Sequence, residues 1–388
     1  MKHFGMLLLL FAVGVVGCAP EAVDDGAEDF ARGQEALNRG EPDFKAAMDS
    51  FAAAAVKNAT NFEARLALAL TALRLGEPRI ADKAASEAVA LDASSAEARL
   101  VEGQSAYLMK DYPRAKASFA AVTGARELPA KMRSEAFSSL AVVEIAAGEI
   151  DSARISLMRA MRLDFRNAAA WYHLGVLSRG TFHFNAAALD QFEMACRLDS
   201  DSARTRNIVR NVIPSLRDSI SSAAADKPGA SKRDPGLAAK LLAEGVTAKK
   251  KKDLKTAVEK FAKAREADPL SWEAACNYAE TLIVAEGAKK PTDKTRLSAA
   301  TVVERTLAAY RDALDAKPTS RETFMAAARF ALQNKRPQAA ADFLSRALAH
   351  FPESKGVLDL YIESLRKLGN DGVRRARLYQ SYRQELGK

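Results

Sequence analysis

The stretch AAAWYHLGVLSRGTFHFNAAALDQFEMACRLD, residues 168–199, decides the fold. It has a W-x2-L-G spacing at Trp171, Leu174 and Gly175. In a second segment, Phe192 follows Ala188 by four residues and Ala195 follows Phe192 by three. Gly and Ala let two helix backbones approach closely, and the large residues fill the space between neighbouring pairs. The stretch therefore predicts two short helices joined by a turn.

The same pattern recurs in phase along the chain. Full copies occupy residues 26–60, 62–95, 134–167, 168–199, 238–271 and 321–354, and one more follows residue 95. Another copy begins at Ser271-Trp272 and contains an insertion, EGAKKPTDKTRLSAA, which we expect to loop out. A partial copy from Leu358 to Tyr382 would cap the array. We count eight repeats and a cap.

These residues resemble the tetratricopeptide repeat (TPR), a pair of antiparallel helices of about 34 residues. The resemblance implies an all-α fold, a TPR-type α-solenoid of helix hairpins, here with about eight repeats in two arrays. A single hairpin cannot bury its apolar face, so stacked copies make a continuous core. In this family the first helix of each repeat lines a concave groove that binds partners.

The composition fits such a helical chain. Aromatic residues make up only 7% of the 388 residues, whereas Ala, Leu, Arg, Lys and Glu dominate. The formal net charge of +9 could attract nucleic acid or anionic lipid. Much of it lies in short clusters such as residues 249–252, typical of solvated helix ends. We expect no nucleic-acid partner.

The amino terminus has the layout of a secretory signal, with Lys2 before an apolar run from Met6 to Val16. The run is too short to span a bilayer, which takes about 20 residues. Val15-Val16-Gly17-Cys18 resembles the lipobox of bacterial lipoproteins. The resemblance implies acylation of Cys18, removal of residues 1–17 and a membrane anchor. Ala19 in place of Asp favours the outer membrane, facing the periplasm. An ordinary cleaved signal with an incidental cysteine is the alternative.

Composition also divides the chain into segments. We expect a signal peptide at 1–17, a lipidated acidic tether at 18–29 and a first array with an extra helix at 30–220. The Ser-, Ala-, Pro- and Gly-rich residues 221–236 predict a flexible linker before a second array with its cap at 237–388. A long loop inside one continuous solenoid is the alternative.

In the first array, the groove positions that the TPR resemblance implies form a mainly apolar stripe with an acidic rim. The rim is Glu63, Glu97 and Glu135. The stripe is Leu66, Leu70, Leu73, Leu100, Gln104, Tyr107, Val142, Ile145, Tyr172 and Val176. It suits an amphipathic helix or an extended peptide with basic residues. The alternative is that another part of the chain covers it.

The second array differs, because Lys249, Lys250 and Arg329 fall near groove positions and could contact an acidic partner. Chaperone-binding repeats of this family grip a terminal carboxylate with Lys and Asn. The first array has Leu at those places, which argues against such a clamp there.

No catalytic motif is found: the sequence has no P-loop, G-x-S-x-G elbow, G-x-G-x-x-G loop or C-x-x-C pair. His173 and His183 are too far apart for a helical metal pair, and we expect no metal or cofactor. Cys196 and Cys276 predict free thiols, with a disulfide as the alternative.

The sequence thus predicts a non-catalytic scaffold or assembly factor of the bacterial envelope that binds a protein or peptide, without a small-molecule substrate. Two alternatives stay open at this point. One is a structural lipoprotein associated with peptidoglycan or polysaccharide. The other is an accessory subunit of an envelope enzyme, with its site at the linker or the insertion at 286–300.

Overall fold

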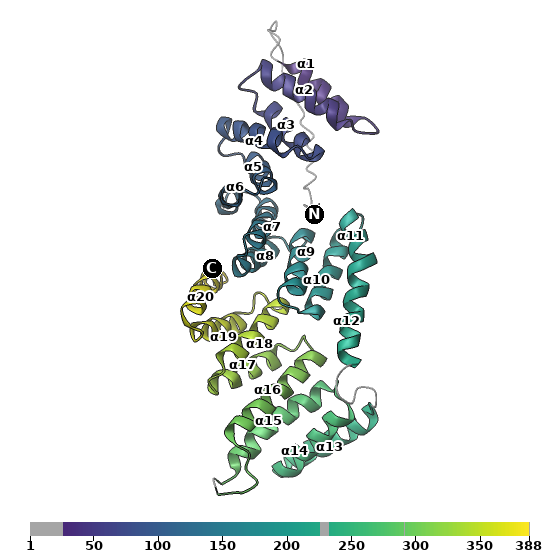
Figure 1. The fold of residues 1–388 in the computed structure, drawn as a ribbon, viewed down its shortest axis with the longest axis vertical. Helices are drawn as coiled ribbons and strands as arrows, with labels where there is room; N and C mark the ends of the chain where they lie inside the picture. Colours follow the sequence, from purple (N-terminus) through teal and green to yellow (C-terminus); the bar gives the residue numbers. More distant parts are fainter. Residues whose placement is uncertain (1–25, 226–232, 291, 388) are drawn as a thin grey trace. The chain divides into compact units, whose positions relative to one another are not determined.

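The computed structural model describes residues 26–225, 233–290 and 292–387, and these form helices without any strand (Figure 1). The chain divides into two compact units, residues 1–173 and 174–388. The boundary lies inside helix α9, Ala168–Gly180, and so differs from the predicted array boundary at 221–236. The predicted signal, anchor cysteine and most of the tether lie outside the described residues.

The first unit contains four helix hairpins, at the places predicted from the repeat. Their helices are α1 Ala27–Asn38, α2 Phe44–Lys57, α3 Phe62–Leu75, α4 Pro78–Leu91, α5 Ala96–Leu108, α6 Tyr112–Gly124, α7 Ala130–Ala146 and α8 Ile150–Leu163. Each helix packs on the next one in sequence. The first helices also touch across repeats, α3 with α5 and α5 with α7. Among the second helices described in the first unit no comparable contact occurs, so the array curves toward its first helices, which line the concave face.

Local sequence explains where these helices begin. Asn61, Ser95 and Asn167 precede first helices, and each side chain accepts a hydrogen bond from a backbone N–H three residues later. Asp43 and Asp111 cap second helices in the same way. Such caps satisfy donors that the helix itself leaves without partners.

Close helix packing within a hairpin depends on a pair of residues 16 to 18 positions apart. Gly33, Gly103, Gly175 and Gly245 lie so close to a Phe ring that an added Cβ would be 2.5–2.9 Å from it. The rings are Phe51, Phe119, Phe192 and Phe261, all buried. Where Ala replaces Gly at the position in the first helix, a residue smaller than Phe occupies the position in the second helix. These pairs are Ala69 with Ala85, Ala141 with Leu157, and Ala328 with Leu344. The sum of the two side-chain volumes is thus limited by the helix separation.

In three of the four hairpins of the first unit, the turn between the two helices has one residue in the left-handed conformation. Gly76 and Gly148 fill this position with φ of 77°, whereas Lys110 adopts a φ of 64° at the equivalent place. A residue with a Cβ pays a steric penalty there.

Replacing Lys110 with glycine should therefore stabilise the first unit by about 1 kcal/mol, because left-handed backbone costs an L-residue roughly 1–2 kcal/mol. Chemical denaturation followed by Trp171 fluorescence in a Trp272→Phe background measures this. Lys83→Gly, in the middle of α4, is the control and should destabilise by a similar amount. A destabilising effect of Lys110→Gly would contradict the strained turn.

The second unit contains the remaining helices. They are α10 Asn185–Leu198, α11 Ala203–Asn207, the π-helix η1 Ile208–Val212, α12 Ile213–Ala225, α13 Pro235–Lys250, α14 Leu254–Ala267, α15 Trp272–Ala288, α16 Ala299–Ala316, α17 Arg321–Gln333, α18 Pro337–His350, α19 Lys355–Arg366 and α20 Gly369–Glu385. Residues 286–288 of the predicted insertion end α15 and residues 299–300 begin α16, and the described residues between them connect the two helices. Helices α13 to α20 are hairpins of the same kind, and α13 contacts α15 as α17 contacts α19.

The predicted extra helix is continuous and longer than expected. Ile208, Ile213 and Leu216 bury their side chains against α10, and the five-residue step from Ile208 to Ile213 is accommodated by the π-helical turn. Helix α12 continues to Ala225 through Ser and Ala residues of the predicted linker, since Ala favours helix strongly. At the linker's other end Pro235 already belongs to α13, capped by Asp234. The residues between, 226–232, lie outside the described part of the chain.

The start and the end of the second unit touch each other. Helix α10 contacts α18, and Gln191 Nε2 donates a hydrogen bond to the carbonyl oxygen of Ala349 at 3.1 Å. These residues are far apart in sequence, so the repeat pattern gave no sign of the contact. Throughout the described ranges, no helix is both long and apolar enough to cross a bilayer.

Candidate partner-binding groove

The predicted groove residues lie on the concave layer of the first unit. Leu66 and Leu70 are on α3, with Leu100, Gln104 and Tyr107 on α5 and Val142 and Ile145 on α7. Leu70 is 37% exposed, and the others are half-buried. Tyr172 and Val176 follow on α9, Tyr172 before the unit boundary and Val176 after it. Helices α3, α5 and α7 of the first unit thus present apolar surface on one face.

Leu73 is the exception to this arrangement. It is only 7% exposed and belongs to the core cluster with Ala84, Ala85 and Val101. The Phe position of this repeat is occupied by Ala85, which leaves a volume that Leu73 fills. Leu73 is a core residue, and its assignment to the groove surface was wrong.

Leu100 and Tyr107 have a mixed role. Leu100 packs against two core clusters, one around Phe119 and one around Val122. Tyr107 packs on the first of these, with its ring centroid 6.1 Å from that of Tyr112. Both side chains support the core as well as the concave face, so replacing them would disturb folding and binding together.

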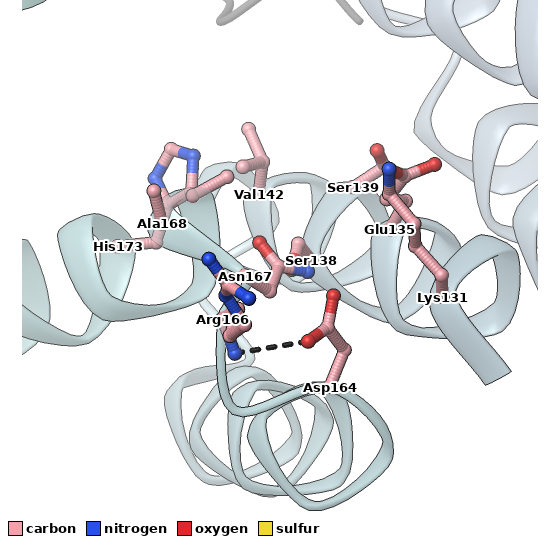
Figure 2. A pocket seen from close by; sticks show the side chains of 11 residues that line it. Lys131, Glu135, Ser138, Ser139, Val142, Asp164, Arg166, Asn167, Ala168 and His173 are labelled. Atoms are coloured by element: carbon pink, nitrogen blue, oxygen red, sulfur yellow. Dashed lines mark hydrogen bonds between the residues drawn. The ribbon is translucent and has the colours of Figure 1, made fainter. Parts of the chain in front are cut away.

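A hollow of about 170 Å³ opens in the first unit between α7 and the start of α9 (Figure 2). Val142, Ala168 and Ala169 give it apolar walls. Charged and polar residues surround them: Lys131, Glu135, Ser138, Ser139, Asp164, Arg166, Asn167 and His173. In Figure 2 the loop residues Asp164 and Arg166 lie between His173 on one side and Lys131 and Glu135 on the other. Two predicted groove positions, Glu135 and Val142, therefore border a cavity.

The floor of the hollow is a buried hydrogen-bond network around Asn167. Its amide nitrogen donates to Ser134 Oγ at 2.8 Å and to Ser138 Oγ at 2.9 Å. Its oxygen accepts from the backbone N–H of Ala170 at 3.0 Å. Ser134 in turn donates to the carbonyl oxygen of Ala160. Such a satisfied network fixes α7, α8 and α9 relative to one another and holds the lining side chains in place.

The acidic rim is partly desolvated. Burial raises the pKa of Glu97. Burial also raises the pKa of Glu135, with Asp164 adding to the rise and Lys131 opposing it. Glu97 lies in the first turn of α5, where the helix dipole favours an anion, whereas Glu135 lies one turn further into α7. A cation from a partner would stabilise both carboxylates, because it would compensate for their lost hydration.

The three basic residues predicted to meet an acidic partner are spread over different helices. Lys249 Nζ lies 3.3 Å from Glu280 Oε2, across from α13 to α15. Lys250 is exposed at the end of α13, and Arg329 is exposed on α17, which α15 separates from α13. The structure does not bring them together as one site.

The remaining candidates behave as ordinary structural residues. Cys196 and Cys276 are free and half-buried, and Cys276 Sγ lies 3.6 Å from Thr323 Oγ1. Burial raises the pKa of both thiols. Within the described ranges, no three His, Cys, Asp or Glu side chains gather as a metal site would require.

Sequence reasoning missed Asn167, Arg166 and His173 as neighbours of the groove. Asn167 could have been found as the cap before an apolar helix. Arg166 lies in the turn between two repeats, a place that a search along first helices does not reach.

The chain matches no family model and no curated protein. Several solved structures are similar in fold. PilF of Pseudomonas aeruginosa is 19% identical with a TM-score of 0.40, over 68% of this chain and 98% of that one. MamA from Desulfovibrio magneticus RS-1 is 18% identical with a TM-score of 0.39, over 47% and 98%. The TPR2AB domain of yeast Sti1, solved as a pHSP90 complex, is 13% identical with a TM-score of 0.27, over 79% and 99%. The likeness concerns the fold alone.

Proposed function

We propose that this chain is a non-catalytic scaffold whose first unit holds a peptide or amphipathic helix on its concave face. The observation that carries the proposal is the row of accessible apolar side chains on consecutive first helices, from Leu70 on α3 to Val142 on α7. A solenoid of small, similar repeats presents such a row as one extended surface. Amphipathic segments bind surfaces of this kind through apolar anchors spaced along one face.

The rim defines the chemistry of the partner. Each apolar anchor that becomes fully buried contributes about 1.5–3 kcal/mol. Lys or Arg residues beside the anchors would meet Glu63, Glu97 and Glu135, of which the last two are partly desolvated. The hollow between α7 and α9 would receive a side chain with an apolar stem and a polar end, because Val142 and Ala169 lie beside charged groups.

Leu70→Lys should weaken capture of the partner by at least about tenfold. The partner would no longer bury the exposed third of Leu70, which is worth roughly 0.5–1 kcal/mol, and it would have to desolvate a cation that repels its basic residues. Co-purification from cells that express the variant at the normal level measures this. Circular dichroism and thermal unfolding should be nearly unchanged, since Leu70 is 37% exposed.

Ile80→Lys is the matched control. Ile80 is 39% exposed and lies on the second helix α4, away from the concave layer. It should retain the partner. Equal loss of the partner from both variants would refute the groove.

The proposal extends to the place where the scaffold acts. The lipobox-like residues Val15 to Cys18 support a lipid-anchored protein of the bacterial envelope, with acyl chains on Cys18 and the repeats in the periplasm at the outer membrane. At least two chains give stable anchoring where one chain gives only marginal binding. Mass spectrometry of the mature amino terminus tests this: an acylated Cys18 is expected, and an unmodified chain starting elsewhere would contradict it.

A further inference from the structure

The second unit carries a dense group of basic side chains at one edge, formed by the turn after α13 and the loop after α15. We define this basic edge as Lys249, Lys250, Lys251, Lys252 and Lys255 with Lys289, Lys290, Lys294 and Arg296. Residues 249–256 and 284–298, which contain all of these side chains, include only three acidic residues, Asp253, Glu286 and Asp293. The edge is therefore strongly positive.

The two segments are neighbours in space although about 40 residues separate them in the chain. The pKa of Asp293 is lowered, first by hydrogen bonds from Thr295 and further by the charges of Lys289 and Lys255. Helix α14 packs on α15, and Lys249 Nζ at the end of α13 lies 3.3 Å from Glu280 Oε2 on α15. Successive helices of the array run in opposite directions, so the start of α14, with Lys255, lies beside the end of α15 and the loop that follows it.

Hydrogen bonds anchor the described residues of the loop on both sides of position 291, and most of the basic side chains there are exposed. The buried Glu286 accepts hydrogen bonds from Lys289 Nζ at 2.7 Å and from the backbone N–H of Leu297 at 2.8 Å. Lys289 Nζ also donates to the carbonyl oxygen of Thr295. Between these anchor points Lys290 and Lys294 are exposed, and Arg296 is exposed beside Leu297.

Ion pairs within the protein do not account for most of these basic side chains. Throughout the described ranges, no ion pair involves Lys250, Lys251, Lys252, Lys255, Lys290 or Lys294. A helix carboxyl terminus favours cations, which accounts for Lys249 and Lys250 in the last turn of α13. It does not account for the loop after α15. Repulsion among so many like charges raises the free energy of the folded protein. An anionic partner would lower it again.

We propose that the basic edge binds the surface of a membrane rich in anionic phospholipid. Six or more Lys and Arg side chains on one exposed edge match the polybasic surfaces that such membranes attract. Val284, on the last turn of α15 next to the loop, is 55% exposed and can enter the interface. Residues 249–256 and 284–298 contain no aromatic side chain for stacking on bases, which favours lipid over single-stranded nucleic acid.

Flotation with vesicles tests the proposal, using the full chain with Cys18→Ser so that no acyl chain can attach. The vesicles are phosphatidylcholine alone or phosphatidylcholine with one-third phosphatidylglycerol. We expect binding to the mixed vesicles only, and its loss when salt is raised from about 0.1 M to 1 M, where the screening length falls from roughly 10 Å to 3 Å. Lys250→Gln, Lys251→Gln, Lys255→Gln and Lys290→Gln together should weaken binding about a hundredfold, since each cation near an anionic surface contributes several-fold.

The control removes the same charge elsewhere on the second unit, through Lys263→Gln, Arg311→Gln, Lys335→Gln and Arg377→Gln, all at exposed positions. It should keep most of the vesicle binding. Equal weakening of both variants would show that vesicle binding depends on the net charge of the chain and not on the basic edge. That result would overturn the proposal. So would equal binding to neutral vesicles, or tighter binding to duplex DNA than to the mixed vesicles. The signal segment is identical in all variants, so success or failure here is independent of acylation at Cys18.

Discussion

Truncation of Phe119 to alanine should remove about 3–5 kcal/mol from the stability of the first unit. Phe119 is 1% exposed and lies against Gly103, Ala106, Leu140 and Val143. Removing the ring leaves a cavity between two repeats, which stacked helices cannot close without losing other contacts. Urea unfolding followed by Trp171 in a Trp272→Phe background reports the first unit. A loss below about 1 kcal/mol would contradict the packing described here.

The pair formed by Gly103 and Phe119 permits a sharper test. Gly103→Ala should destabilise by about 1–3 kcal/mol, because the new Cβ would be 2.8 Å from the Phe119 ring. Phe119→Leu in the same chain should recover much of that loss, since Ala with Leu is the combination at Ala141 and Leu157. A double-mutant cycle gives the coupling. Purely additive effects would mean that the two positions do not share one volume.

Raising the pH through neutrality should destabilise the first unit through Glu144. Burial raises the pKa of Glu144 to about 7, while Ser156 Oγ, 2.7 Å away, and Lys116 act in the opposite direction. The unfolded chain has a pKa near 4.5 at this position. Between these two values the folded state holds a proton that the unfolded state has lost. Its stability therefore falls as the pH rises from about 4.5 to 7, by roughly 3 kcal/mol in full, and this loss persists above pH 7.

Glu144→Gln should remove this pH dependence. The variant should be roughly 3 kcal/mol more stable than the parent chain at pH 8, and nearly equal to it at pH 4.5. The glutamine oxygen can still accept the hydrogen bond from Ser156. Glu127→Gln, at an exposed loop position, is the control and should leave the pH profile unchanged. An unchanged difference between parent and Glu144→Gln at both pH values would show that Glu144 is ionised throughout.

The repeat pattern predicted the helix hairpins because each positional requirement has a local cause. Gly103 had to be small to admit Phe119, and Asn61, Ser95 and Asp111 mark helix starts by their capping chemistry. The phase of the repeat then placed Leu70 and Val142 on the concave face. These features could be predicted from the sequence because each involves only residues within one repeat.

Features that depend on several repeats could not be predicted from the repeat pattern. Leu73 is buried in a cluster that includes Met48 and Val101 of the two neighbouring repeats, and the pattern within one repeat does not reveal this packing. The contact between Gln191 and Ala349 joins distant helices that no periodicity relates. The hollow depends on Arg166 and Asn167 in a turn, whose position follows from the stacking of α7 and α9.

The use of the concave face can be tested most directly by site-specific photocrosslinking in intact cells. A crosslinking residue is placed at Leu70, Gln104 or Val142 on three consecutive first helices, and at the exposed Ala90 or Ala120 on second helices as controls. One and the same partner should be captured from all three concave positions and from neither control. Capture from the second helices alone, or equal capture from every position, would contradict binding in the groove.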